Sequence, residues 1–163
     1  MPINVQVKRT IEIAHDCQGT YDLVKDVKQS GECMSSVEEV VPLGDGKFEF
    51  ILREQGLDGV KSMTFKGRYI AQYQFEPNVI SWTSIGGNMS SSGRYEFEPT
   101  EKGVKIHAQL SNQLPISVPA IFRIPAELVV KHELLKTVVD MLKKVTLGDQ
   151  QFQNTKADGE VSL

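Results

Sequence analysis

The fold is decided by residues 79–110, which read VISWTSIGGNMSSSGRYEFEPTEKGVKIHAQL. Two runs of alternating apolar residues flank a glycine- and serine-rich segment, SIGGNMSSSG, at residues 84–93. A phosphate-binding glycine loop leads into the N-terminus of a helix, where free backbone amides meet the anion. Here the segment leads into RYEFEP, whose alternation is typical of a strand. We therefore expect the corner of a β-hairpin and no phosphate site.

The same alternation predicts strands over most of the chain. In the first strand, residues 4–13, one face carries Val5, Val7, Arg9, Ile11 and Ile13. Short helical turns are expected in residues 15–31, because a polar start is followed by clustered apolar residues. The further strands are expected at residues 36–43, 47–54, 60–75, 79–85, 93–99 and 104–112. A tight turn at residues 44–46, GDG, joins the second strand to the third.

The pattern changes period after residue 114. Prolines at positions 115, 119 and 125 exclude a central strand there. Residues 126–145 have helical spacing, with Pro125 in the first turn and a stop at Gly148. The stripe facing the sheet is expected to hold Leu128, Leu135, Val138, Leu142 and Val145. These elements predict an α+β fold, in which a curved antiparallel sheet wraps around the last helix.

Composition restricts the class of protein. The 163 residues fit a single domain, expected at residues 1–148, followed by a polar and flexible tail at 149–163. The net charge is −3 without a block of Lys and Arg, which argues against nucleic acid as a partner. No apolar run approaches twenty residues, so no integral membrane segment is expected. We expect a cytoplasmic monomer or weak homodimer in which Cys17 and Cys33 are reduced.

Several residues in the hairpin region carry a resemblance to a known superfamily. Its sequences often have a strand ending in Trp, a glycine-containing turn, a Gly-aromatic-x-Phe-x-Pro strand, and a glycine before the next strand. The matching residues here are Trp82, Gly93, Tyr95, Phe97, Pro99, Gly103 and Val104. Over roughly residues 3–147 the chain resembles the START-like (SRPBCC) superfamily, which includes polyketide cyclases/dehydrases and lipid-binding proteins. It departs from the quinone-binding branch at residues 28–37, KQSGECMSSV, where that branch tends to have an aromatic and a Phe-x-Pro segment.

The resemblance implies a helix-grip fold, with a seven-stranded sheet around the C-terminal helix, two short helices after the first strand, and an apolar cavity between sheet and helix. Combining this fold with the strand registers gives the candidates for the cavity wall. They are Arg9, Phe50, Glu54, Phe65, Tyr69, Tyr73, Trp82, Tyr95, Leu128, Leu135 and Val138. The aromatic residues among them have two alternative roles, since they line a pocket in an open grip and only pack in a closed core.

Arg9 raises a separate question, because it lies on the apolar face of its strand. A buried guanidinium needs a partner, and Glu54 has the right parity to provide one inside the cavity. The alternative is that the strand twists or ends near the rim, so that Arg9 reaches water. The three histidines are far apart in sequence and have no ligand spacing, so neither a metal site nor a cofactor is expected.

The expected function is binding or transport of a small hydrophobic molecule, such as a lipid, an isoprenoid or a polyketide-like compound. The sequence shows no recognisable catalytic residue. The alternative is an enzyme of the cyclase or dehydratase type, which would use Arg9, Glu54, Tyr69 and Tyr73 as polar groups in the same cavity.

Overall fold

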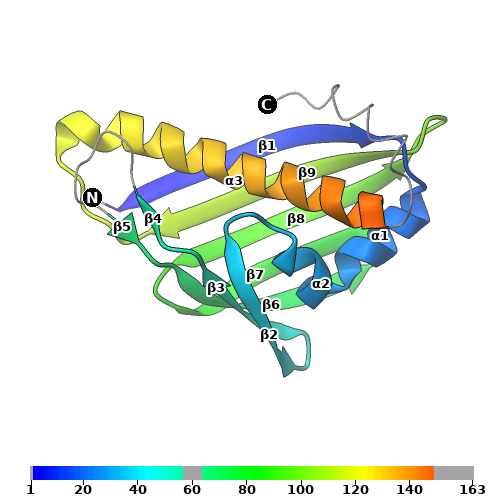
Figure 1. Ribbon diagram of the computed structural model, residues 1–163, viewed down its shortest axis with the longest axis horizontal. Helices are drawn as coiled ribbons and strands as arrows, with labels where there is room; N and C mark the ends of the chain where they lie inside the picture. The colour runs from blue at the N-terminus through cyan, green and yellow to red at the C-terminus, as the bar shows by residue number, and fades with distance from the viewer. Residues whose placement is uncertain (1, 57–63, 149–163) are drawn as a thin grey trace.

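The computed structural model describes residues 2–56 and 64–148. The first part of the strand expected at residues 60–75 and the whole tail expected at residues 149–163 lie outside the described residues. The described chain forms an antiparallel sheet, two short helices and one long helix, which is the predicted α+β class (Figure 1). None of these helices has both the length and the apolar character needed to cross a membrane.

The main sheet of the described chain has seven strands, in the order β1-β9-β8-β7-β6-β3-β2, and all neighbours are antiparallel. β4 and β5 pair with each other in a separate two-stranded sheet. The described part of the strand expected at 60–75 is therefore divided into β5 and β6, and Lys66 and Gly67 between them belong to no strand. The strands are β1 (Ile3–Ile13), β2 (Val37–Gly44), β3 (Lys47–Leu52), β4 (Gln55–Gly56), β5 (Thr64–Phe65), β6 (Arg68–Glu76), β7 (Val79–Gly87), β8 (Ser90–Pro99) and β9 (Val104–Leu114).

Two short helices follow β1, as predicted. They are α1 (Cys17–Lys25) and α2 (Val27–Glu32), and an aspartate caps each of them. The Asp16 carboxylate accepts a hydrogen bond from the backbone N–H of Gly19 at 2.7 Å, and Asp26 accepts one from the N–H of Gln29 at 3.3 Å. Both cysteines are free thiols, also as predicted.

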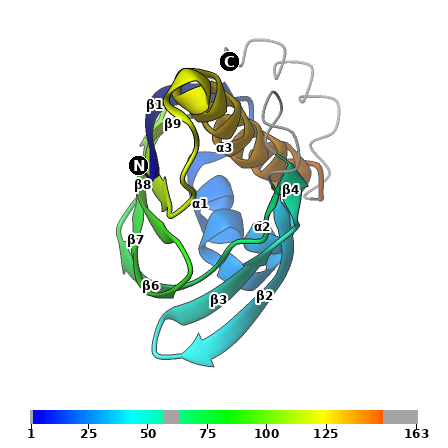
Figure 2. The same cartoon turned by 90° about the vertical axis from the view of Figure 1, so that its left-hand side faces the viewer.

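The long helix α3 (Ala120–Gly148) crosses the open side of the curved sheet (Figure 2). Inward residues of the strands alternate with outward ones, so Val104, Ile106, Ala108 and Leu110 of β9 are buried. The helix supplies the other half of the core from its second half: Leu135, Val138, Val139, Met141, Leu142 and Val145 are all buried. The core therefore lies between the inner face of the sheet and the C-terminal half of α3.

The glycine- and serine-rich segment is a hairpin, as expected. β7 runs on to Gly87 and β8 begins at Ser90, so the connection is only two residues long. Gly87 has φ +116°, and a Cβ there would lie 2.2 Å from the carbonyl oxygen of Arg68. Asn88 holds the corner against β6, because its Oδ1 accepts from the N–H of Arg68 and its Nδ2 donates to the carbonyl of Lys66, at 2.8 and 3.0 Å. The residues that suggest a phosphate loop are used to close a turn.

The start of α3 differs from the prediction. The helix begins at Ala120, five residues before the expected first-turn proline, and Pro125 lies inside it. Pro125 lacks the N–H of a helical hydrogen bond, which costs stability. The extra turn brings Phe122 against a second apolar cluster formed by Ile3, Val5, Leu114 and Ala126, and this burial offsets the missing bond. The same turn leaves Ile121 and Ile124 exposed.

Candidate functional site

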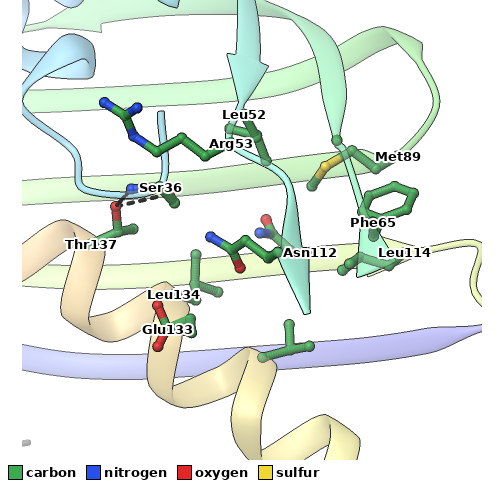
Figure 3. A pocket seen from close by; sticks show the side chains of 13 residues that line it. Ser36, Leu52, Arg53, Phe65, Met89, Asn112, Leu114, Glu133, Leu134 and Thr137 are labelled. Carbon is green, nitrogen blue, oxygen red and sulfur yellow. Dashed lines mark hydrogen bonds between the residues drawn. The ribbon is translucent and has the colours of Figure 1, made fainter. Parts of the chain in front are cut away.

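A cavity lies between the middle of α3 and the end of the sheet opposite α1, and its volume is about 70 Å³ (Figure 3). Elements far apart in sequence supply its walls, including the end of β3 and the residue after it, the β4–β5 ribbon, the β7–β8 connection, the end of β9, and α3. It is lined by Ser36, Leu52, Arg53, Gln55, Phe65, Gly67, Met89, Asn112, Leu114, Val130, Glu133, Leu134 and Thr137. Most of this lining is apolar, as expected of a pocket that takes an apolar molecule.

Met89 and Gly67 form the inner wall of the cavity. A Cβ on Gly67 would lie 2.6 Å from the Met89 sulfur and 2.9 Å from Leu52, so a side chain there would displace Met89 and Leu52. Met89 itself is buried, and Phe65 lies next to it (Figure 3). The inner wall is therefore made by a flexible thioether over a glycine, and not by a branched residue.

One end of the cavity is fixed by hydrogen bonds between α3 and the segment before β2. The backbone N–H of Ser36 donates to Thr137 Oγ1 at 3.1 Å, and the two hydroxyl oxygens lie 2.9 Å apart (Figure 3). Arg53 Nε donates to the carbonyl of Ser35 at 3.3 Å, which holds this exposed side chain at the rim. These polar groups have partners within the protein and are therefore structural.

Three other polar side chains of the lining, Gln55, Asn112 and Glu133, have no such role. Asn112 and Glu133 are half-buried, and they extend from β9 and α3 toward the cavity (Figure 3). Within residues 2–56 and 64–148, no hydrogen bond or ion pair holds the Asn112 carboxamide or the Glu133 carboxylate. Groups of this kind are available to a ligand, because the folded chain does not use them.

The predicted aromatic candidates form a packed group beside the cavity. Phe50 stacks on Tyr69 with ring centroids 5.1 Å apart, Tyr73 lies 5.7 Å from Trp82, and Trp82 lies 5.1 Å from Tyr95. A Cβ on Gly93 would lie 2.4 Å from the Trp82 ring, so the glycine makes room for the indole. Of the two roles expected of the aromatic set, packing in the core describes these five residues. Phe65 alone of the predicted candidates lines the cavity.

The hydroxyls of this aromatic group are buried in apolar surroundings. Burial raises the pKa of Tyr69 to about 12, although a hydrogen bond with Ser91 works in the opposite direction. Burial also raises the pKa of Tyr73 and Tyr95, and each of these shifts is increased by a neighbouring tyrosine. The three phenols are therefore neutral hydrogen-bonding groups throughout the physiological pH range.

The remaining predicted site residues lie away from the cavity. Arg9 is exposed because β1 is an edge strand of the sheet, where an inward side chain can still reach water, so the solvent-reaching alternative holds for this residue. Glu54 is also exposed, and no ion pair joins it to Arg9 in the described chain. The prediction that Leu128 belongs to the helix face toward the sheet was wrong, because Leu128 is 60% exposed. Leu135 and Val138 are buried in the core between α3 and the sheet.

Sequence reasoning missed most of the cavity lining. Asn112 had a usable signal, because the inward alternation of Val104 to Leu110 continues to it at position 112. Glu133 and Thr137 are one helical turn apart, but the periodicity that predicts a buried helix face is a periodicity of apolar residues and gives no signal for polar ones. Met89 lies in the hairpin corner, where its burial depends on the neighbouring β6 and on no local pattern.

Comparisons with known proteins bear on the fold. No protein-family model matches the sequence, and no curated protein matches it. Among solved structures, one from Thermus thermophilus is 16% identical with a TM-score of 0.64, covering 89% of this chain and 98% of that chain. A START superfamily protein from Mycobacterium smegmatis is 15% identical with a TM-score of 0.60, covering 88% and 95% of the two chains.

The third comparison is the Zhui aromatase/cyclase from Streptomyces sp. R1128. It is 14% identical with a TM-score of 0.58, and the match covers 88% of this chain and 94% of that chain. At such identities the likeness concerns the path of the backbone. It agrees with the seven-stranded sheet, the two short helices after β1 and the long C-terminal helix described above. The chain has the START-like helix-grip fold.

Proposed function

We propose that this protein binds a small hydrophobic molecule in the cavity between α3 and the open end of the sheet. The observation that carries the proposal is the lining itself, in which an apolar wall surrounds three polar groups that the fold does not use, Gln55, Asn112 and Glu133. The solved structures of the same fold support it, since a START superfamily protein and an aromatase/cyclase are among them.

The size of the cavity limits the ligand. Its volume of about 70 Å³ is smaller than the roughly 150 Å³ of an engineered cavity that takes up benzene. Entry of a ring-sized molecule therefore requires side-chain movement in the wall. Met89 and Leu134 are apolar lining residues that can move in this way, because methionine and leucine side chains each have several rotamers. We expect ligands of one or two rings, or a short chain.

The test compares two leucines on the same helix. Leu134 lines the cavity, whereas Leu128 is 60% exposed and lies outside it. Leu134→Trp should fill the space, and Leu128→Trp is the matched control. Purified wild-type protein is first examined by native mass spectrometry for a bound apolar compound. Amide NMR titrations with ethylbenzene, a small apolar probe, then compare the wild type and the two variants.

We expect ethylbenzene to shift amide signals of the cavity wall in the wild type and in Leu128→Trp. Binding should be lost in Leu134→Trp. A bound ligand should also raise the melting temperature, because it stabilises only the folded state. The proposal fails when no apolar compound copurifies and ethylbenzene leaves every amide signal of the wild type unchanged. It fails equally when the two tryptophan variants bind the probe alike.

A further inference from the structure

A row of polar side chains crosses the otherwise apolar inner face of the sheet. Asn112, in the cavity wall, lies directly opposite Ser91 of β8 in the strand register, and such pairs have Cβ atoms about 5 Å apart. Ser91 is 5% exposed, and its Oγ accepts a hydrogen bond from Trp82 Nε1 at 3.2 Å. The Ser91 hydroxyl also acts on the Tyr69 phenol, whose pKa it lowers against the effect of burial. The row therefore begins at the cavity and continues into the core.

The hydrogen bonds along this row have a direction. An indole N–H can only donate, so Ser91 Oγ is an acceptor from Trp82 and its own proton is available to the Tyr69 oxygen. The Tyr69 hydroxyl can then donate its own proton to another acceptor. The Tyr95 hydroxyl is completely buried, and it has no hydrogen-bond partner among the described residues. Leaving a buried hydroxyl unpaired costs free energy, which a suitable ligand atom would recover.

Met89 separates these hydroxyls from the cavity. Met89 directly precedes β8 and lies two residues before Ser91, and both residues are buried whereas Ser90 between them is exposed. Met89 lines the cavity on one side and belongs to the same buried cluster as Tyr69, Trp82 and Tyr95 on the other. An unbranched thioether can change rotamer without moving the backbone. A small shift of Met89 would therefore join the cavity to the buried hydroxyls.

We propose that the cavity extends past Met89 to an inner polar pocket formed by Ser91, Tyr69 and Tyr95, and that its ligand is an apolar molecule carrying a hydrogen-bond acceptor oxygen, such as a ketone. This inference rests on the proposed function and adds the chemical class of the ligand. The neutral phenols keep their protons, so Tyr95 and Tyr69 donate to the ligand oxygen while the hydrocarbon part occupies the outer cavity. Asn112 lies beside the entrance to the inner pocket.

The experiment uses two probes of nearly equal size, acetophenone and ethylbenzene, which differ by one carbonyl oxygen. Amide NMR titrations measure their dissociation constants for the wild type, Tyr95→Phe and Met89→Ala. We expect the wild type to prefer acetophenone. Tyr95→Phe should weaken acetophenone about tenfold, the effect of losing one neutral hydrogen bond, and leave ethylbenzene unchanged. Met89→Ala should strengthen acetophenone, because the path to the hydroxyls is open.

Melting temperatures without probe give an independent arm. Tyr21→Phe is the matched control, because Tyr21 is a buried residue whose hydroxyl donates a part-buried hydrogen bond to the carbonyl of Glu76 at 2.7 Å. Its loss should lower the melting temperature by about 2–4 °C. Tyr95→Phe should not lower it, since an unpaired hydroxyl is removed. An equal loss in both variants would show that a buried water already satisfies Tyr95, and would overturn the inference.

The two proposals fail in different ways. Equal affinity of the wild type for both probes would overturn the acceptor-oxygen inference and leave apolar binding in place. An unchanged acetophenone affinity in Tyr95→Phe would do the same. Absence of binding for both probes, in the wild type and in Met89→Ala, would overturn the proposed function together with the inference.

Discussion

Replacing Met89 with alanine removes Cγ, Sδ and Cε from the wall between the cavity and the tyrosine hydroxyls. Met89 is 7% exposed, so the truncation removes almost fully buried atoms. Such changes cost about 2–5 kcal/mol in protein cores. The existing cavity of about 70 Å³ borders the exposed Arg53, so water can enter the enlarged space. We therefore expect the low end, about 2 kcal/mol, which corresponds to a fall in melting temperature of about 4–8 °C.

The assay is urea unfolding followed by tryptophan fluorescence, since Trp82 is the single tryptophan and lies in the same buried cluster. Met89→Leu is the control, because a nearly isosteric replacement should cost less than about 1.5 kcal/mol. Adding ethylbenzene should recover part of the loss in Met89→Ala, since a ligand in the enlarged cavity stabilises the folded state. A loss below about 0.5 kcal/mol, typical of a surface site, would refute the placement of Met89 in the cavity wall.

Three further predictions follow from the packing and the protonation of buried groups. Gly87→Ala should destabilise the protein by about 1–3 kcal/mol in urea unfolding, because the φ of Gly87 is +116° and a Cβ would lie 2.2 Å from the Arg68 carbonyl oxygen. Gly86→Ala is the control, since a Cβ there would have no contact closer than 3.8 Å. Equal losses of unfolding free energy in the two variants would contradict the reasoning. Leu135→Ala should cost about 2–5 kcal/mol, whereas Leu128→Ala should stay within about 0.5 kcal/mol, since Leu135 is 6% and Leu128 60% exposed. The third prediction concerns alkaline pH. Burial raises the pKa of Tyr69 to about 12, whereas a tyrosine in an unfolded chain has a pKa near 10. The contribution of Tyr69 to folding stability is therefore complete below pH 10 and is lost as the pH rises toward 12. Tyrosinate absorbance and circular dichroism should therefore change together in an alkaline titration, and ionisation of most tyrosines without loss of structure would contradict the burial.

The hairpin and the wrapped sheet could be predicted because their signals are local. Alternation fixes which strand face is buried, and Gly87 and Asn88 supply the corner that the backbone needs. The buried face of α3 could be predicted from Leu135 onward for the same reason. In this part of the helix the apolar residues recur at helical spacing, because each turn contributes to the core.

The start of α3 and the cavity wall depend on contacts that no local pattern records. Phe122 is held by a cluster built from β1, β9 and α3, so the helix extends through Pro125 against its propensity. Arg9 follows the parity of a buried residue, yet it reaches water because β1 is an edge. Met89 and Glu133 line one cavity only because the folded chain brings the β7–β8 connection and α3 to its walls.

The central claim is that a small apolar molecule binds inside the grip, under the middle of α3. The most direct measurement is a set of intermolecular NOEs between acetophenone and protein labelled at methionine and leucine methyl groups. We predict contacts from the acetophenone ring to the Met89 ε-methyl and to the methyl groups of Leu52, Leu114 and Leu134, the labelled side chains that line the cavity together. Contacts confined to the exposed Leu128 and Leu43 would show surface binding and would contradict the claim.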